Sequence, residues 1–215
     1  MRVGILGSGG VAQALGTGFV TLGHDVKLGT RTPAADKLRL WVKQAGTQGS
    51  VGSFGEAAAF GELAVLATAW SGTENALKLA GPPTLAGKVL IDVTNPFRAA
   101  PNGSPTLAVG WMDSGAEQVQ RWVPGAKVVK AFNTVGNPHM FRPQFPGGPP
   151  DMFICGNDAS ARQTVGDICK SFGWGVIDLG GIESARYIEP LAMVWTTYAF
   201  RTNTWNHAFK LLRRS

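Results

Sequence analysis

Residues 1–16 read MRVGILGSGGVAQALG, and this stretch decides the fold. Residues 2–6 form a short run, β-branched at Val3 and Ile5, which stops at glycine as a buried parallel strand does. The next residues, Gly7-Ser8-Gly9-Gly10-Val11-Ala12, fit the G-x-G-x-x-G/A fingerprint of dinucleotide-binding folds. In that fingerprint Gly7 permits the tight turn, Gly9 lets the backbone approach the pyrophosphate, and Ala12 lets helix and strand pack closely. Because the helix that follows presents free N–H groups and its positive dipole end, the sequence predicts a dinucleotide site here.

The end of the second predicted strand decides which dinucleotide binds. It reads Gly29-Thr30-Arg31-Thr32, and no Asp or Glu stands between Asp25 and Asp36. NAD-binding forms place a carboxylate about 20 residues after the glycines to accept the ribose 2′-hydroxyl, whereas an arginine suits a 2′-phosphate. Arg31 can pair with that phosphate, and Thr30 and Thr32 offer hydroxyl donors. The sequence therefore predicts NADP(H), and Thr32 before Pro33 predicts a helix that runs to about Lys43.

Strands alternate with helices along the rest of the chain. Strands are expected within 62–68, 88–94, 126–133, 151–156 and 175–180, and helices within 72–80 and 114–123, after Asp158, and within 184–200. Ser114 and Glu117 predict a capping box, and Asp158 a second cap. This order predicts an α/β fold, a Rossmann-type doubly wound, mostly parallel sheet with a short helical C-terminal extension. We expect an NADP-binding Rossmann-like domain over 1–180 and an extension, 181–215, that packs on the sheet or on a partner subunit.

Composition narrows the class of protein. With 215 residues, 44% hydrophobic and 16% charged, the chain is globular. The net charge is +6, and the excess of basic residues lies near the glycine loop and in the tail KLLRRS, which is expected to be a solvated helix end. The sequence has no stripe of basic residues interleaved with aromatic ones, so a nucleic-acid partner is not predicted. No apolar run approaches the ~18 to 20 residues of a membrane span, and the N-terminus is a poor signal peptide. A cytoplasmic protein is expected. Cys155 and Cys169 lack metal-ligand spacing and are expected to be buried thiols, so no metal site is predicted.

Common acid–base patterns of dehydrogenases are absent from the sequence. Neither Tyr187 nor Tyr198 is followed four residues later by lysine, and only about 35 residues follow 175–180, too few for the helical domain of β-hydroxyacid dehydrogenases. Among the histidines only His139, on the proline-rich loop 136–150, is placed to face a site. Hydride transfer between two planar rings needs mainly proximity and orientation, so this absence favours a planar, small-molecule redox acceptor. Reduction of a small carbonyl or imine, or a non-catalytic NADPH sensor, remain alternatives.

Several stretches also carry a resemblance to known families. MRVGILGSGGVAQALG, TLGHDVKLGTR, AVLATAW and ESARYIEPLAMVW resemble the NADP-dependent deazaflavin (coenzyme F-420) oxidoreductase family over nearly the whole chain. VVKAFNTV and MFICGNDASARQ are similar to the cytosolic NADPH-binding domain of six-transmembrane ferric reductases, which pass hydride from NADPH to a flavin. The resemblance implies a homodimeric NADP-dependent oxidoreductase whose second substrate is a deazaflavin or a flavin. The deazaflavin reductases carry histidine where this chain has Asn133, and the ferric reductases carry asparagine, so both acceptors stay open.

The same resemblance implies a nicotinamide pocket at the ends of the later strands. Asn133 is the candidate for orienting the nicotinamide amide or the acceptor, with the loop 136–150 and the C-terminal helix bounding the acceptor's side. The predicted cofactor-binding residues are Gly7, Ser8, Gly9, Gly10, Val11, Ala12, Thr30, Arg31, Thr32, Thr68, Ala69, Trp70, Asn95, Pro96 and Asn133.

The helix expected over 184–200 bears on assembly. It is apolar on one face, and so much apolar surface on a terminal helix predicts packing against a second subunit as well as against its own sheet. The residues of that face are Ile188, Leu191, Ala192, Trp195 and Ala199.

Overall fold

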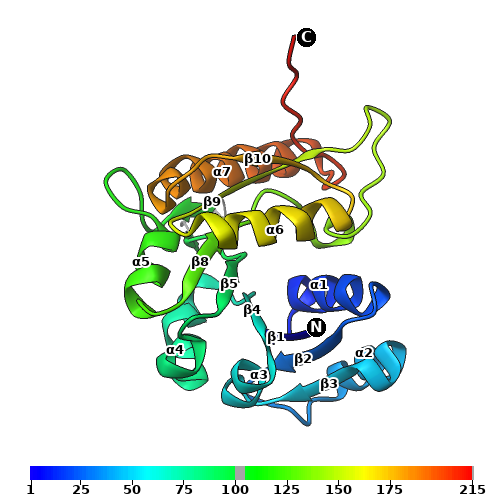
Figure 1. The fold of residues 1–215 in the computed structure, drawn as a ribbon. Helices are drawn as coiled ribbons and strands as arrows, with labels where there is room; N and C mark the ends of the chain where they lie inside the picture. The colour runs from blue at the N-terminus through cyan, green and yellow to red at the C-terminus, as the bar shows by residue number, and fades with distance from the viewer. Residues whose placement is uncertain (100–104, 215) are drawn as a thin grey trace.

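A computed structural model describes residues 1–99 and 105–214, which build one large sheet with helices on both faces (Figure 1). Its strands are β1 (Arg2–Leu6), β2 (Asp25–Gly29), β3 (Gly49–Gly52), β4 (Leu63–Leu66), β5 (Val89–Asp92), β8 (Lys127–Lys130), β9 (Asp151–Gly156) and β10 (Gly175–Asp178). They lie in the order β10-β9-β8-β5-β4-β1-β2-β3. Neighbouring strands run parallel, apart from β8 and β9, which pair antiparallel. The predicted mostly parallel, doubly wound sheet is confirmed. A separate hairpin pairs β6 (Phe97–Ala99) with β7 (Pro105–Leu107).

Two apolar clusters fill the layers on either side of the sheet. One contains residues of α1 (Gly10–Thr21), α2 (Asp36–Ala45) and α6 (Ala159–Ser171), with Phe19 packed edge-on against Phe172. The other contains residues of α3 (Phe54–Phe60), α4 (Trp70–Ala80), α5 (Gly115–Trp122) and α7 (Ala185–Thr202). Short 3-10 turns complete the fold: η1 (Gly46–Gln48), η2 (Pro82–Leu85), η3 (Asn137–His139) and η4 (Ile182–Ser184). The central strands are covered on both faces, which explains why they read as unbroken apolar runs.

The first strand–helix unit follows the sequence closely. Leu15 and Phe19 are buried along one face of α1, and Gly23 adopts a left-handed φ of 82° just past its end, where the sequence places a C-cap. The next helix departs from the prediction, because α2 begins at Asp36 and not at Thr32. The Thr32 carbonyl accepts the Ala35 N–H at 3.1 Å in a turn, and Ala35 is extended, so the helix cannot start earlier.

Two other elements differ from the sequence prediction. The segment between α2 and β4 contains β3 and α3, and α3 starts with a complete capping box between Ser53 and Glu56 that the sequence analysis overlooked. The predicted box at α5 is only half formed: the Ser114 hydroxyl accepts the Glu117 N–H at 3.2 Å. The Glu117 carboxylate accepts two bonds from Arg186, a residue of α7: one from Nε at 2.9 Å and one from Nη2 at 2.6 Å. A long-range ion pair thus takes the place of the second bond of the capping box, while the Ser114 hydroxyl still donates to Glu117 Oε2 at 2.7 Å.

The chain after α7 does not continue as a helix. Asn203 takes a left-handed conformation that ends α7, and the tail returns to the start of β9, where the Phe209 carbonyl accepts the Asp151 N–H at 2.9 Å. The prediction of a helix end in the tail was therefore wrong. Cys155 and Cys169 are buried free thiols, as predicted, and burial raises the pKa of the Cys155 thiol to about 12. Across the described ranges, 1–99 and 105–214, none of the helices is both long and apolar enough for a membrane span. The division into units 1–180 and 181–215 stays a prediction.

Candidate active site

The glycine loop between β1 and α1 leaves open space at the helix N-terminus. Gly7 has a φ of 148°, and a Cβ there would overlap the Ala67 carbonyl, so only glycine fits. Its N–H donates to the Gly29 carbonyl at 3.0 Å and joins the ends of β1 and β2. Gly9 is the N-cap of α1 without a side-chain cap, and a Cβ at Gly9 would meet nothing within 4 Å. The first N–H groups of α1 are therefore available to an anion, as a pyrophosphate site requires.

The end of β2 supplies the second part of this region. Thr30 is buried, and its Oγ1 accepts the Ser8 hydroxyl at 3.1 Å and the Thr32 N–H at 3.3 Å. Arg31 is exposed and forms no ion pair with a residue that the structure describes. A cavity of about 330 Å³ lies between them and β4; its lining residues are Gly7, Ser8, Gly9, Thr30, Arg31, Phe54, Ala67, Thr68, Ala69, Ser71, Gly72 and Asn75.

A second cavity, of about 420 Å³, adjoins the first across the ends of β1, β4 and β5. The two share Gly9, Thr68 and Ser71 among their walls, so they form one groove over the carboxyl ends of the strands. In the strand order, β1 lies between β4 and β2, the place where open α/β sheets bind ligands. The second cavity is lined by Gly9, Gly10, Val11, Ala67, Thr68, Ala69, Trp70, Ser71, Val93, Thr94, Asn95 and Phe97.

Most of the predicted site residues meet in this groove, and a few do not. Ala12 is buried under it against the sheet, as its packing role requires. Thr32, Pro96 and Asn133 are not among the residues that line either cavity. The groove is also lined by residues that the sequence analysis did not select: Phe54 of the overlooked α3, and Ser71 and Asn75 of α4.

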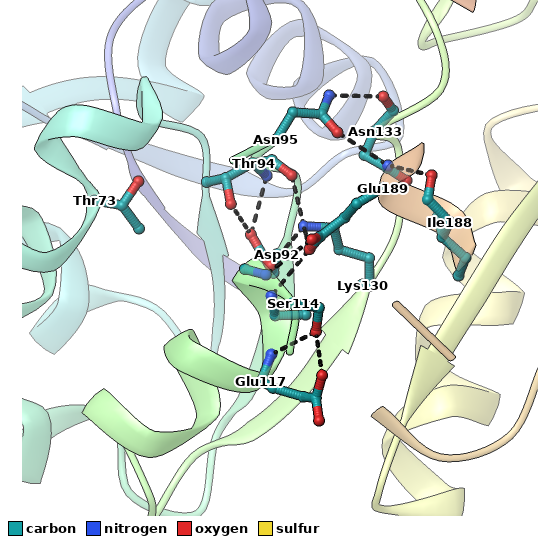
Figure 2. Close-up of polar contacts among 12 residues, drawn as sticks. Thr73, Asp92, Thr94, Asn95, Ser114, Glu117, Lys130, Asn133, Ile188 and Glu189 are labelled. Carbon is teal, nitrogen blue, oxygen red and sulfur yellow. Dashed lines mark hydrogen bonds and ion pairs between the residues drawn. The ribbon is translucent and has the colours of Figure 1, made fainter. Parts of the chain in front are cut away.

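Asn95 and Asn133 form a reciprocal pair that joins the ends of β5 and β8 (Figure 2). Asn133 Nδ2 donates to Asn95 Oδ1 at 3.1 Å and to the Ile188 carbonyl of α7 at 3.2 Å. Asn95 Nδ2 donates to the Asn133 carbonyl at 2.8 Å. Asn133 is 4% exposed, and its Oδ1 has no partner among the described residues. A buried amide oxygen without a partner is costly, so this atom is suited to accept a bond from a ligand.

Three buried charged side chains, Asp92, Lys130 and Glu189, lie next to this pair (Figure 2). Lys130 Nζ contacts Asp92 Oδ2 and Glu189 Oε1, each at 2.9 Å, and donates to the Thr94 carbonyl at 2.6 Å. Burial lowers the pKa of Lys130, but the two carboxylates outweigh it and hold that pKa above its usual value. The sequence carries the signal as single charges inside apolar runs, VLIDV, VVKAF and YIEPLA, which the sequence analysis did not use.

The carboxylates of this cluster are also tied to the backbone. Asp92 Oδ1 accepts the N–H and the hydroxyl of Thr94 at 2.9 and 2.7 Å. Glu189 accepts the N–H groups of Gly115 and Ala116, at 2.8 and 3.0 Å, and so caps the N-terminus of α5 from α7. One network therefore connects the groove wall at Thr94 with α5 and α7.

The loop 136–150 lies beside the groove without lining it. The Asn137 amide lies next to Gly10, where a Cβ would come within 2.7 Å of its Nδ2. His139 Nε2 bonds to Asn206 of the tail at 3.0 Å. The loop's role on the acceptor side stays a prediction. A further cavity of about 550 Å³, which the sequence did not indicate, lies between residues 107–111 and the start of α7.

Comparison with known proteins gives a consistent picture. A family model described as "NADP oxidoreductase coenzyme F420-dependent" matches residues 2–96. The crystal structure of a "putative f420 dependent nadp-reductase" from Arthrobacter sp. FB24 superposes with a TM-score of 0.94 at 38% identity, covering 99% of this chain and 100% of that one. The F420-dependent NADP reductase of Methanocaldococcus jannaschii is 28% identical over 89% of both chains.

A second group of relatives is longer than this chain. Rat metalloreductase STEAP3 is 30% identical over 89% of this chain. The match covers 36% of that protein, and the match to human metalloreductase STEAP2 covers 20%, so this chain spans about a third or less of their length.

Proposed function

The chain belongs to the family of coenzyme F420-dependent NADP oxidoreductases, and from this premise we propose that it transfers hydride between NADP(H) and a deazaflavin or a flavin. The observation that carries the proposal is the two-part groove over the strand ends. One part offers a helix N-terminus without a side-chain cap and Arg31, which has no ion pair among the described residues, and the other offers the indole of Trp70 and the amide of Asn95. These residues fit a dinucleotide whose phosphates lie at Gly9 and whose redox ring lies at β4 and β5.

Each part of the groove has its own task. The N–H groups of α1 bind the pyrophosphate, and Arg31 pairs with the 2′-phosphate beside the Ser8–Thr30 hydroxyls. When bound, NADPH supplies a hydride at its nicotinamide ring. Asn95, which lines the second cavity, orients the ring's carboxamide or a polar edge of the acceptor, and Asn133 acts through its hydrogen bond to Asn95. No side chain needs to carry a proton if a planar acceptor stacks on the ring at ~3–3.5 Å.

The experiment that tests this function is an acceptor scan. Purified protein is mixed with NADPH and a deazaflavin, FMN, FAD or a panel of carbonyls and imines, and the loss of NADPH absorbance is followed. We expect turnover with one or more of the ring acceptors and none above background with the small substrates. Turnover confined to a carbonyl or an imine would contradict the proposal, and so would NADPH binding without any turnover, which is the behaviour of a sensor.

We also propose that α7 joins two copies of the chain into a homodimer. The face predicted to meet a partner is largely covered by the chain itself, because Ile188, Ala192 and Ala199 are at most 1% exposed. A different stripe of the same helix is apolar and free: Tyr187, Val194 and Tyr198 are 74, 58 and 52% exposed. Positions i, i+7 and i+11 share one side of a helix, so these residues form a continuous patch suited to its own symmetry mate.

A further inference from the structure

The cluster of Asp92, Lys130 and Glu189 ties β5, β8, α5 and α7 together with buried charges. All three side chains are at most 1% exposed. Burying charges carries a large desolvation cost, and apolar residues of similar volume often stabilise a core equally well or better. Buried charges next to a cleft are therefore candidates for a functional role.

The cluster carries a net negative charge. Every contact of the two carboxylates is with an N–H, an ammonium or a hydroxyl that donates to them, which is the pattern of ionised carboxylates. Lys130 supplies one positive charge, so the formal sum of the three side chains is −1. The N-terminus of α5 at Glu189 offsets roughly half a charge. A negative potential remains in a region of low dielectric.

The groove lies one hydrogen bond away from this charge. Thr94 lines the second cavity and donates its hydroxyl to Asp92 Oδ1 at 2.7 Å. Asn95 also lines that cavity, and its partner Asn133 bonds to Ile188, the residue before Glu189. None of the described residues that line the second cavity is charged; the buried cluster is joined to its wall through Thr94, and the N-termini of α1 and α4 add partial positive charge.

We propose that this cluster stabilises the cationic, oxidised nicotinamide relative to the neutral, reduced ring, and so favours hydride release from NADPH to the acceptor. The inference rests on the proposed function, because it requires the redox ring to lie in the second cavity. Hydride transfer breaks a C–H bond of the ring, moves both electrons with the hydrogen to the acceptor, and leaves a positive charge on the ring. Asp92 and Glu189 are positioning residues here, since they act on the ring through the field and through Thr94 and Asn133.

The expected size follows from Coulomb's law. With an effective dielectric of about 20 and a separation of about 10 Å, removal of one unit charge changes the relative affinity for the two forms on the order of tenfold. The quantity to measure is the ratio of the dissociation constants of NADP+ and NADPH, obtained by titration calorimetry without any acceptor.

The variants distinguish the effect of the cluster's net charge from the effect of a disturbed structure. Asp92→Asn and Glu189→Gln lie on different elements, and each brings the cluster to a formal charge of zero, so both should raise the NADP+/NADPH ratio about tenfold. The double variant Lys130→Met/Glu189→Gln restores −1 and should bring the ratio back to within about threefold of wild type. Glu62→Gln is the control, since Glu62 pairs with Arg2 at the opposite ends of the strands, and its ratio should not change.

The outcomes distinguish this inference from the proposed function. A wild-type protein that binds neither nucleotide contradicts the proposed function. Normal binding of both forms, with a ratio that is unchanged or moves oppositely in the two single variants, overturns the inference alone. If the single variants fail to fold by circular dichroism, the wild-type protein decides: NADP+ binding more than about tenfold weaker than NADPH binding overturns the inference, and comparable or tighter binding supports it.

Discussion

Replacing Arg31 with alanine removes the one charged side chain among the residues that line the 330 Å³ cavity. A charge-assisted hydrogen bond contributes about 1.5–3 kcal/mol. Because Arg31 is exposed and solvent screens it, we expect the lower half of this range, about 1.5–2 kcal/mol. This corresponds to NADPH binding that is about 10- to 30-fold weaker. NADH lacks the 2′-phosphate, so its affinity should change less than about twofold.

The assay is a pair of fluorescence titrations, with NADPH and with NADH, at two salt concentrations. The preference of wild type for NADPH should shrink as salt rises, because counterions screen exposed charges, with a Debye length of ~8 Å at physiological ionic strength. Arg39→Ala is the matched control: Arg39 is an exposed arginine of α2 that pairs with Asp36 and does not line the groove. Equal losses for the two nucleotides in Arg31→Ala, or an equal loss in Arg39→Ala, would refute the assignment of Arg31 to the 2′-phosphate.

Three further predictions concern the loop, the amide pair and the assembly. Gly9→Val should abolish NADPH binding while the melting temperature stays within a few degrees, because the new side chain enters open space. Unchanged nucleotide binding in this variant would contradict the loop's role. Gly7→Val should instead prevent folding, because position 7 accepts only glycine. Asn133→Ala should lower turnover severalfold without removing a limb from the pH–rate profile, whereas loss of a limb only in His139→Ala would point to proton transfer from the loop. Tyr198→Asp should shift the mass in light scattering from dimer to monomer, and a wild-type monomer at all concentrations would exclude the proposed interface.

The parts of the fold with local signals were predictable. The strand ending at Gly7, the helix that Gly23 ends and the cap at Asp158 each depend on a few neighbouring residues, and the structure has all three. The start of α2 was not predictable, because the same residues suit a turn at Thr32 and a helix that begins there. The two differ only in the conformation of Ala35. The half-formed box at Ser114 failed for another reason: Arg186, distant in the sequence, competes for the Glu117 carboxylate.

The candidate site likewise has a part with local sequence signals and a part without them. Its phosphate half is built from contiguous residues at two strand ends, so a motif could identify it. Its redox half depends on residues that meet only after β5, β8 and α7 have packed together: Asn95 with Asn133, and Lys130 with Glu189. No spacing in the sequence connects these positions, although a charge inside each of three apolar runs was visible.

The candidate site and the proposed dimer interface share the C-terminal helix α7. On its inner side the Ile188 carbonyl holds the Asn133 amide, and the Glu189 carboxylate joins Lys130 to the N-terminus of α5. On its outer side Tyr187 and Val194 remain exposed. Because adjacent residues of one rigid helix serve both sides, a partner that packs on α7 also restricts the position of Glu189 and the field at the groove. We therefore expect the Tyr198→Asp monomer to lose more turnover than its nucleotide affinity explains. Equal turnover of monomer and dimer would contradict this coupling between the proposed interface and the candidate site.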